Sequence, residues 1–272
     1  MNMTTTNTKG NPDISVAAIT RRGWREISPA VFAVVGTLIL WELAVKWLKV
    51  PEIIIAAPSS IGHSLVHNAK LLADSSGVTL AIIVYGFALS VVLGIVLALL
   101  LVRFPTASRA VYPLVVLFQT VPKVALAPIF VIWFGYDLSP KILLIIVISF
   151  FPISLNMIAG LRSVDPNLLL LMRSIGCSKT ETLLRVMVPS ALPSLFAGLK
   201  IGVTFSVIGA IVAEFSGANR GLGYLIQFAS SQLDTPLVFA SLVVVSAMGV
   251  ALFYAVALLE HFIIPWASSS EI

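Results

Sequence analysis

The chain has 272 residues, of which 58% are hydrophobic and only 11% carry a charge, and its mean hydropathy is +1.04. This composition excludes an ordinary soluble domain and predicts a single all-α integral membrane domain. The net charge of +5 does not call for nucleic acid as a partner, because membrane proteins gather Lys and Arg in their cytoplasmic loops.

The N-terminal stretch is rich in Thr and Asn and contains Pro and Gly. It lacks the apolar density needed to pack, so we expect residues 1–25 to form a disordered cytoplasmic tail. No small-residue cleavage site follows a short apolar core, which argues against a signal peptide. Arg21 and Arg22 match a twin-arginine signal weakly and, with Arg25, are better explained as charges that orient the first span.

Residues 26–266 are predicted to form the transmembrane domain, followed by a C-terminal tail at 267–272. Stretches of about 20 apolar residues can each cross a bilayer. Six such spans are predicted, at Pro29–Leu48, Val78–Val102, Tyr112–Phe134, Lys141–Leu161, about Leu195–Ala213, and Leu237–Leu259. Gly86 and Gly94 of the second span are candidates for close helix packing.

Ionisable and polar residues inside the predicted spans are candidate functional residues, because burying them is costly. Glu42 and Lys46 are four residues apart with Glu first, which favours a mutual ion pair. Lys123 lies in the third span, which Pro122 and Pro128 interrupt. It either lines the substrate path, where it would attract an anionic group, or pairs with a carboxylate or carbonyl inside the bundle. The translocation pathway is assigned to Gln119, Lys123 and Asn156.

A polar segment at residues 165–193 separates the fourth and fifth spans. Asp165 can cap a first short helix, with Pro166 at its favoured first position, and Gly176 can end it. Ser178 and Glu181 form the Ser-x-x-Glu pattern of a capping box, which predicts the start of a second short helix. Pro189 and Pro193 are expected to close the segment, because proline cannot continue a helix interior. We expect the second helix to present Lys179, Thr182 and Arg185 on one side and Leu183, Leu184 and Met187 on the other.

Basic residues predict the orientation of the chain. With the N-terminus inside, the inner segments hold most of the Lys and Arg, and the outer segments hold only Lys49, Lys70, Lys141 and Arg220. Both termini and the segment 165–193 are therefore expected to be cytoplasmic.

No catalytic constellation is visible in the sequence, which contains no phosphate-binding loop, no zinc-protease motif and no nucleophile elbow. The single cysteine, Cys177, excludes an internal disulfide framework and a cysteine-rich metal site. His63 and His67 lack further ligands and are interpreted as solvated loop residues, so no metal site is expected. A membrane enzyme such as a polyprenyl-type transferase would need clusters of acidic metal ligands, and the sequence contains none, which disfavours this class. A transporter without its own motor must use a gradient or borrow ATP hydrolysis, and the amphipathic second helix favours the latter.

The spacing of Gly176, Val186, Val188 and Pro189 resembles the cytoplasmic "EAA" loop of permease subunits of bacterial ABC importers, roughly E-A-A-x3-G-x9-I-x-L-P. The E-A-A triplet itself is replaced by Leu170, Leu171 and Met172. The chain looks closest to the nitrate/sulfonate/taurine-type branch, and the resemblance covers nearly everything beyond the tail. It implies a six-span type I importer permease fold in the bacterial inner membrane, with 165–193 as the coupling-helix loop. The residues implied to couple to the ATPases are Gly176, Ser178, Lys179, Glu181, Arg185 and Pro189.

The same resemblance implies the partners: a second permease copy, two ATPase subunits that hold ATP and Mg, and an extracytoplasmic solute-binding protein. The segment from Glu214 to Tyr224 is similar to an external loop of these permeases, which assigns Glu214, Gly217 and Gly221 to an outer gate or receptor-facing surface; a plain turn is the alternative. The stretch from Gln119 to Gly135 looks like relatives that handle heterocycles such as thiamine-precursor pyrimidines, whereas the wider branch takes sulfonates, taurine, nitrate and bicarbonate. The competing class is a gradient-driven secondary transporter or channel, but the inverted repeats typical of such carriers are not evident.

Overall fold

The computed structural model describes residues 16–267, and every element in that range is helical. The chain divides into two units, residues 1–60 and 61–272, and each is described by itself. The disordered tail predicted at 1–25 falls mostly outside the described residues, although the first helix already begins at Val16.

The first unit contains α1 (Val16–Trp47) and the first turn of α2 (Pro58–His67). The predicted ion pair is confirmed, because Lys46 Nζ lies 2.6 Å from Glu42 Oε1. The Glu42 carboxylate also accepts hydrogen bonds from the Ser59 backbone amide (2.9 Å) and the Ser59 hydroxyl (2.8 Å). Glu42 therefore joins the end of α1 to the start of α2, which the sequence analysis did not anticipate.

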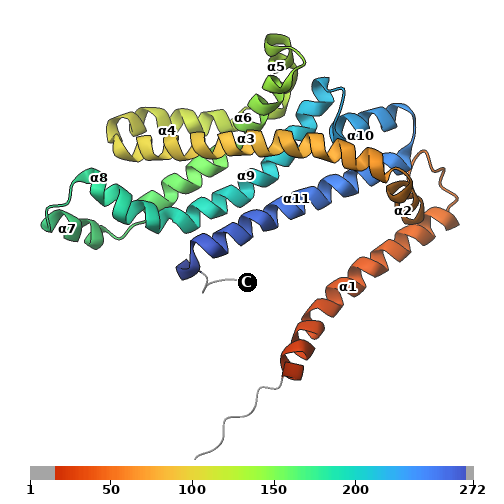
Figure 1. Ribbon diagram of the computed structural model, residues 1–272, viewed down its shortest axis with the longest axis horizontal. Helices are drawn as coiled ribbons and strands as arrows, with labels where there is room; N and C mark the ends of the chain where they lie inside the picture. Colours follow the sequence, from red (N-terminus) through yellow and green to blue (C-terminus); the bar gives the residue numbers. More distant parts are fainter. Residues whose placement is uncertain (1–15, 268–272) are drawn as a thin grey trace, which may run out of the picture. The chain divides into compact units, whose positions relative to one another are not determined.

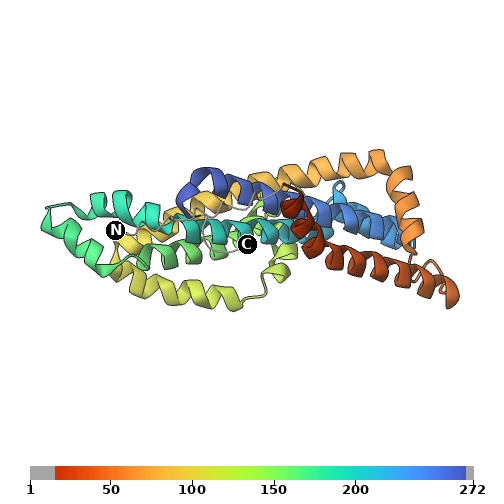
Figure 2. The same cartoon turned by 90° about the horizontal axis from the view of Figure 1, so that it is seen from below.

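The second unit is a helical bundle (Figure 1). Its helices are α3 (Ala69–Arg103), α4 (Pro105–Thr120), α5 (Ala127–Phe134), α6 (Leu138–Arg162), α7 (Pro166–Ser174), α8 (Lys179–Thr182), α9 (Val188–Gly217), α10 (Leu222–Ser231) and α11 (Thr235–Ile263). Short 3₁₀ turns lie at Lys123–Leu126 and Pro265–Ala267, and a π-helical turn lies at Leu183–Met187. Within this unit, α7 and α8 lie at one end and α10 at the other (Figures 1 and 2).

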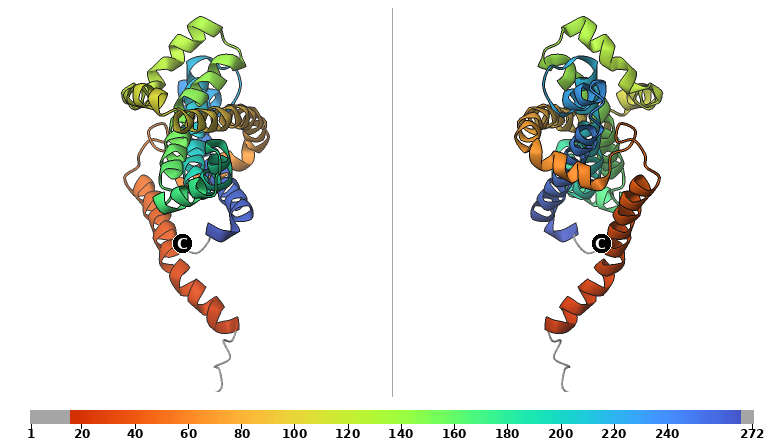
Figure 3. Two further views of the ribbon diagram at one scale, coloured as in Figure 1. Left: turned by 90° about the vertical axis from the view of Figure 1, so that its left-hand side faces the viewer. Right: turned by 90° about the vertical axis from the view of Figure 1, so that its right-hand side faces the viewer.

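The centre of the bundle is α6, which packs against both α3 and α9. Glycines permit this close approach. A Cβ added to Gly86 would lie 2.6 Å from Ile145, and one added to Gly94 would lie 2.9 Å from Ile153. The prediction that these two glycines serve close packing is confirmed. In the end-on views of Figure 3, α4 and α5 lie at the periphery of the unit.

The membrane-span candidates in the structure differ from the six predicted spans. In the described residues, four helices are long and apolar enough to cross a membrane, and a fifth span is obtained if the bent pair at Ser108–Phe134 is counted as one. That pair bends by 85°, and Pro122 lies at the break, as the proline argument predicted. The predicted first span lies in α1, which is not among the candidates.

Candidate functional site

The first helix of the segment 165–193 is capped as its sequence predicts. Asp165 Oδ1 accepts a hydrogen bond from the Asn167 backbone amide at 2.8 Å, and Pro166 occupies the first turn of α7. The helix ends at Ser174, and Gly176 follows with φ of +80°, a conformation that side chains other than glycine rarely adopt. The cap and the glycine together fix where α7 begins and where it ends.

The second helix begins with the predicted capping box. The Ser178 hydroxyl accepts from the Glu181 amide at 3.2 Å, and the Glu181 carboxylate accepts from the Ser178 amide at 2.9 Å. The hydrogen bond that the Ser178 amide donates to the carboxylate, with a smaller contribution from the nearby Arg185 charge, holds the pKa of Glu181 below its ordinary value. Both side chains are exposed, so the box shapes a solvent-facing turn.

The prediction that Pro189 and Pro193 close this segment is wrong. The chain continues from α8 through the π-helical turn directly into α9, so Lys179–Gly217 is one apolar helix of 39 residues. Pro189 lies in the first turn of α9 and follows a widened turn. Proline is tolerated where its missing amide would have no helical partner, and a π turn supplies such a position. Pro193 lies inside α9.

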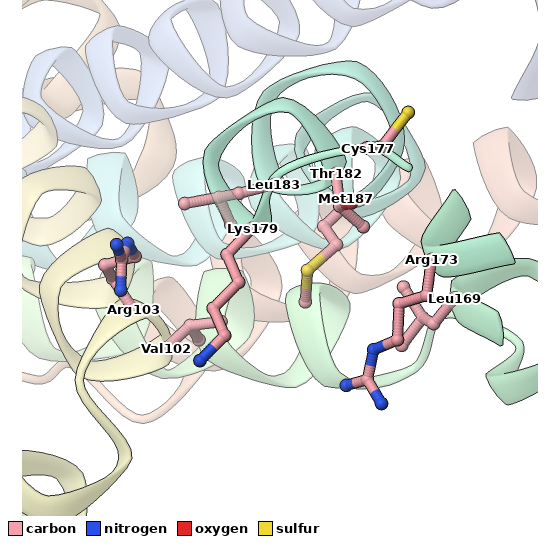
Figure 4. Close-up of a pocket in the computed structure, with 9 residues that line it drawn as sticks. All are labelled: Val102, Arg103, Leu169, Arg173, Cys177, Lys179, Thr182, Leu183 and Met187. Atoms are coloured by element: carbon pink, nitrogen blue, oxygen red, sulfur yellow. The ribbon is translucent and has the colours of Figure 1, made fainter. Parts of the chain in front are cut away.

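A pocket of about 290 Å³ lies between α7, α8 and the end of α3 (Figure 4). Three of its lining side chains are cations: Arg103, Arg173 and Lys179. Four are apolar: Val102, Leu169, Leu183 and Met187. Thr182 and Cys177 complete the lining, and Lys179 extends from α8 toward Val102 at the end of α3 (Figure 4). Lys179, Thr182, Leu183 and Met187 therefore share one site, whereas we had expected the polar and apolar residues on opposite sides.

The other residues predicted to couple to ATPases are accessible. Gly176, Ser178, Glu181 and Arg185 are exposed and Pro189 is half-buried, whereas Leu184, predicted on the apolar side, is 58% exposed. Arg185 does not line the pocket. The segment thus presents a capped and solvent-facing turn of the kind that a protein partner can dock against. The coupling role itself stays a prediction.

Two of the residues assigned to the translocation pathway, Gln119 and Lys123, flank the break in the third predicted span, whereas Asn156 lies on α6 against Gly198 of α9. The Lys123 amine lies 4.7 Å from the centre of the Phe151 ring of α6, a cation–π contact. In the described part of the chain no carboxylate pairs with Lys123, so the carboxylate partner considered in the sequence analysis is not present there. Asn156 donates to the Pro152 carbonyl of its own helix at 2.8 Å, and Gln119 is exposed. No hydrogen bond among the described residues joins these three side chains, and their shared role in the pathway stays a prediction.

The predicted outer loop begins later than its sequence suggests. Helix α9 continues to Gly217, and Glu214 is fully buried rather than exposed at a gate. Its carboxylate accepts from the Thr79 hydroxyl (2.8 Å) and from the Gly223 amide (2.6 Å), and the Thr79 hydroxyl accepts from the Leu222 amide (2.8 Å). Glu214 therefore joins α9 to α3 and to the start of α10.

Two further features support this buried network. Gly221 has φ of +112°, and a Cβ there would collide with the Glu214 carboxylate. The buried Lys141 of α6 places a positive charge near enough to attract the same carboxylate. Gly217 lies against Tyr136, whose ring an added Cβ would approach to 2.7 Å. Sequence reasoning missed Thr79 and Lys141 as partners, and only the position of Lys141 at the edge of a predicted span hinted at a special role.

No group of three or more His, Cys, Asp and Glu that could hold a metal occurs among the described residues. His63 and His67 stack within α2 with ring centroids 5.9 Å apart, so they lie on a helix and not in a loop.

Comparison with known proteins gives a consistent result. The family described as "Binding-protein-dependent transport system inner membrane component" matches residues 90–265. A formylaminopyrimidine transport permease protein, ThiX of Halalkalibacterium halodurans, is 38% identical over 246 residues, which cover 90% of this chain and 98% of that protein. The taurine transport system permease protein TauC of Escherichia coli is 33% identical, covering 65% of this chain and 64% of TauC.

Solved structures of low identity share the fold. An amino acid ABC transporter has a TM-score of 0.58 at 16% identity, covering 74% of this chain and 95% of that chain. The MetNI methionine ABC transporter has a TM-score of 0.50 at 20% identity, covering 69% and 95%. These matches agree with the all-α permease fold that the sequence predicts.

Proposed function

We infer the function of this chain from its family: the chain belongs to the binding-protein-dependent transport system inner membrane components and is an ABC transporter permease. We propose that it forms half of the translocation pathway of an ATP-driven importer for a small organic solute. The observation that carries this proposal is the 38% identity with a formylaminopyrimidine permease over 90% of the chain. The chain itself would be a non-catalytic subunit, with ATP and Mg bound on partner subunits.

The segment 165–193, here called the coupling segment, supports an ATP-driven mechanism. Its two helices are capped at fixed positions, and the side chains at Ser178, Glu181 and Arg185 are exposed. Because α8 continues into α9, a force applied at Lys179 is carried into a helix that crosses the membrane domain. An ATPase subunit docked on this segment could therefore drive the permease without any contact inside the membrane.

The proposed assembly contains two copies of this permease, two ATPase subunits and an extracytoplasmic solute-binding protein, in the bacterial inner membrane. The excess of Lys and Arg in the segments assigned to the inside supports cytoplasmic termini. The exposed apolar surface of α3 and α11, including Val92, Leu93, Phe253 and Tyr254, suits contact with lipid or with a second copy.

We propose a pyrimidine-like heterocycle as the substrate class. A second candidate, a sulfonate or taurine, is favoured by the 33% identity with TauC and by the positive charge of Lys123 near the break in the path. Gln119, Lys123 and Asn156 remain the proposed pathway residues, and the turn formed by Gly217 and Gly221, held by Glu214, is the proposed support of the outer gate.

Two experiments test the proposal. Purification of the tagged chain in mild detergent should recover an ATPase subunit, and the double variant Lys179→Glu, Arg185→Glu should lose it. Recovery of the ATPase with both the wild-type chain and the double variant would place the docking surface elsewhere. If no ATPase is recovered with either, the proposed coupling is refuted. Uptake of radiolabelled aminopyrimidine and of radiolabelled taurine is measured in cells that express the whole transporter. Transporter-dependent uptake of taurine, competed by unlabelled taurine but not by unlabelled aminopyrimidine, would overturn the proposal of a heterocyclic substrate.

A further inference from the structure

The cationic pocket lies where two candidate membrane spans end. Arg103 is the last residue of the span Ala69–Arg103, and Lys179 is the first residue of the helix Lys179–Gly217. Both side chains line the same pocket, so both spans end on the same side of the domain. Cations near the ends of membrane helices can reach the lipid headgroups, because their apolar stems lie along the hydrocarbon while the charges extend to its polar surface.

The positive charge of this pocket is not neutralised by the segment around it. The two carboxylates of the segment 165–193 are both engaged in caps: Asp165 binds the Asn167 amide and Glu181 binds the Ser178 amide. None of the lining residues is acidic, and among the described residues Arg103, Arg173 and Lys179 make no ion pair. In this part of the chain the three cations are exposed and unpaired, so an anion can bind them through charge-assisted hydrogen bonds without displacing an existing partner.

The apolar part of the lining indicates the rest of that occupant. Val102, Leu169, Leu183 and Met187 form it, and Leu183 is buried in the same core as Leu101 of α3. A soluble anion would gain nothing from these side chains, whereas the glycerol and first methylenes of a lipid would. The volume of about 290 Å³ suits a headgroup and its phosphate, with the acyl chains remaining in the bilayer.

We propose that this pocket binds the phosphate of an anionic phospholipid from the leaflet that borders α7 and α8. Arg103, Arg173 and Lys179 surround the phosphate, and the four apolar side chains contact the glycerol end of the chains. Basic pockets between membrane helices on the cytoplasmic side are suited to lipid headgroups of this kind. The bound lipid would tie the coupling helices to the end of α3. This binding requires no ATPase subunit and so stands apart from the proposed coupling.

Cys177 provides the reporter, since it is the only cysteine of the chain, is half-buried and lines the pocket. The full chain is placed in nanodiscs of phosphatidylcholine, with or without phosphatidylglycerol, and the rate of maleimide labelling is measured. Phosphatidylglycerol should slow labelling several-fold in the wild type. Each basic residue near an anionic surface is worth about fivefold in affinity, so the triple variant Arg103→Gln, Arg173→Gln, Lys179→Gln should weaken lipid binding on the order of a hundredfold.

The matched control is Arg185→Gln, which removes one charge from the same segment but lies outside the pocket; it should keep the wild-type ratio of the two rates. Lys179→Gln alone alters one exposed side chain and should reduce the apparent lipid affinity about fivefold, which keeps the test valid if the triple variant does not fold. Equal slowing in the triple variant would assign the effect to surface charge and overturn the proposal. So would slowing by inorganic phosphate in pure phosphatidylcholine, or protection that appears only when ATPase subunits are added.

Discussion

Replacing Thr79 by valine should destabilise the bundle although the shape of the side chain is kept. The Thr79 hydroxyl donates to the buried Glu214 carboxylate and accepts from the buried Leu222 amide, both at 2.8 Å. Valine removes both of these hydrogen bonds, as well as the longer one that the hydroxyl donates to the Ser75 carbonyl at 3.2 Å, and leaves the Leu222 amide unpaired. An unpaired buried donor costs about 1–3 kcal/mol, and the lost bond to the carboxylate adds a comparable amount. Because hydrogen bonds between membrane helices fall at the low end of such ranges, we expect about 2 kcal/mol in total.

The assay is unfolding of the purified full chain in mild detergent by added dodecyl sulfate, followed by circular dichroism. Thr204→Val is the matched control, because its hydroxyl is exposed and bonds only to the Lys200 carbonyl of its own helix. We expect that control to shift the free energy of unfolding by less than about 0.5 kcal/mol. Equal midpoints for Thr79→Val and Thr204→Val would refute the argument that the Glu214 network holds α3, α9 and α10 together.

Four further predictions concern packing, capping, pH dependence and transport. Gly94→Ala should cost about 1–3 kcal/mol in the same unfolding assay, because its new methyl group would meet α6, whereas Gly77→Ala, which has open space around it, should be neutral or slightly stabilising. Ser178→Ala should cost the start of α8 about 1 kcal/mol, seen as about fivefold faster amide exchange in residues 179–187. The folded chain lowers the pKa of Glu181, so the carboxylate should contribute fully to the stability of the cap at pH values above the ordinary carboxylate pKa. That contribution should be lost as the pH falls through the lowered pKa. Amide exchange rates that stay constant over this pH interval, after correction for their intrinsic pH dependence, would contradict the prediction. Lys123→Gln should raise the KM of uptake about fivefold at equal abundance in the membrane, and an unchanged KM would remove Lys123 from the pathway.

Features that depend on neighbours along the chain were predictable. The Asp165 cap, the Ser178–Glu181 box and the Glu42–Lys46 pair each join residues two to four positions apart, and all are present. Local rules of capping and helical spacing are sufficient for them. The rough positions of four apolar helices were predictable as well, because about 20 apolar residues are needed to cross a bilayer, but these helices have 25 to 39 residues and extend beyond the predicted spans.

Features that depend on distant parts of the chain were not predictable. Thr79 and Glu214 are separated by 135 positions, and nothing near either residue indicates the other. A single sequence shows that Glu214 is polar, so placing it in a loop was the natural interpretation, while burial of its carboxylate depends on donors supplied by α3 and α10. The prediction for Pro189 was wrong for a different reason. The rule that proline ends a helix assumes a regular α-helix, whereas the π turn before Pro189 places it where a backbone amide would have no helical partner.

The continuity that this turn creates connects the two ends of the domain. The helix from Lys179 to Gly217 has 39 residues, so at about 1.5 Å per residue it extends about 58 Å. One end carries the exposed cations of the coupling segment, and near the other end lies the buried Glu214 that holds α3 and α10. Along its middle, glycines such as Gly202 bring α9 so close to α6 that an added Cβ would lie 2.8 Å from Ile153. Packing this tight leaves little room for α9 to slide along α6, so we expect the two helices to move together. Because α6 also carries Phe151, which contacts the Lys123 amine, we expect a displacement at Lys179 to reach the broken span as well as the Glu214 network.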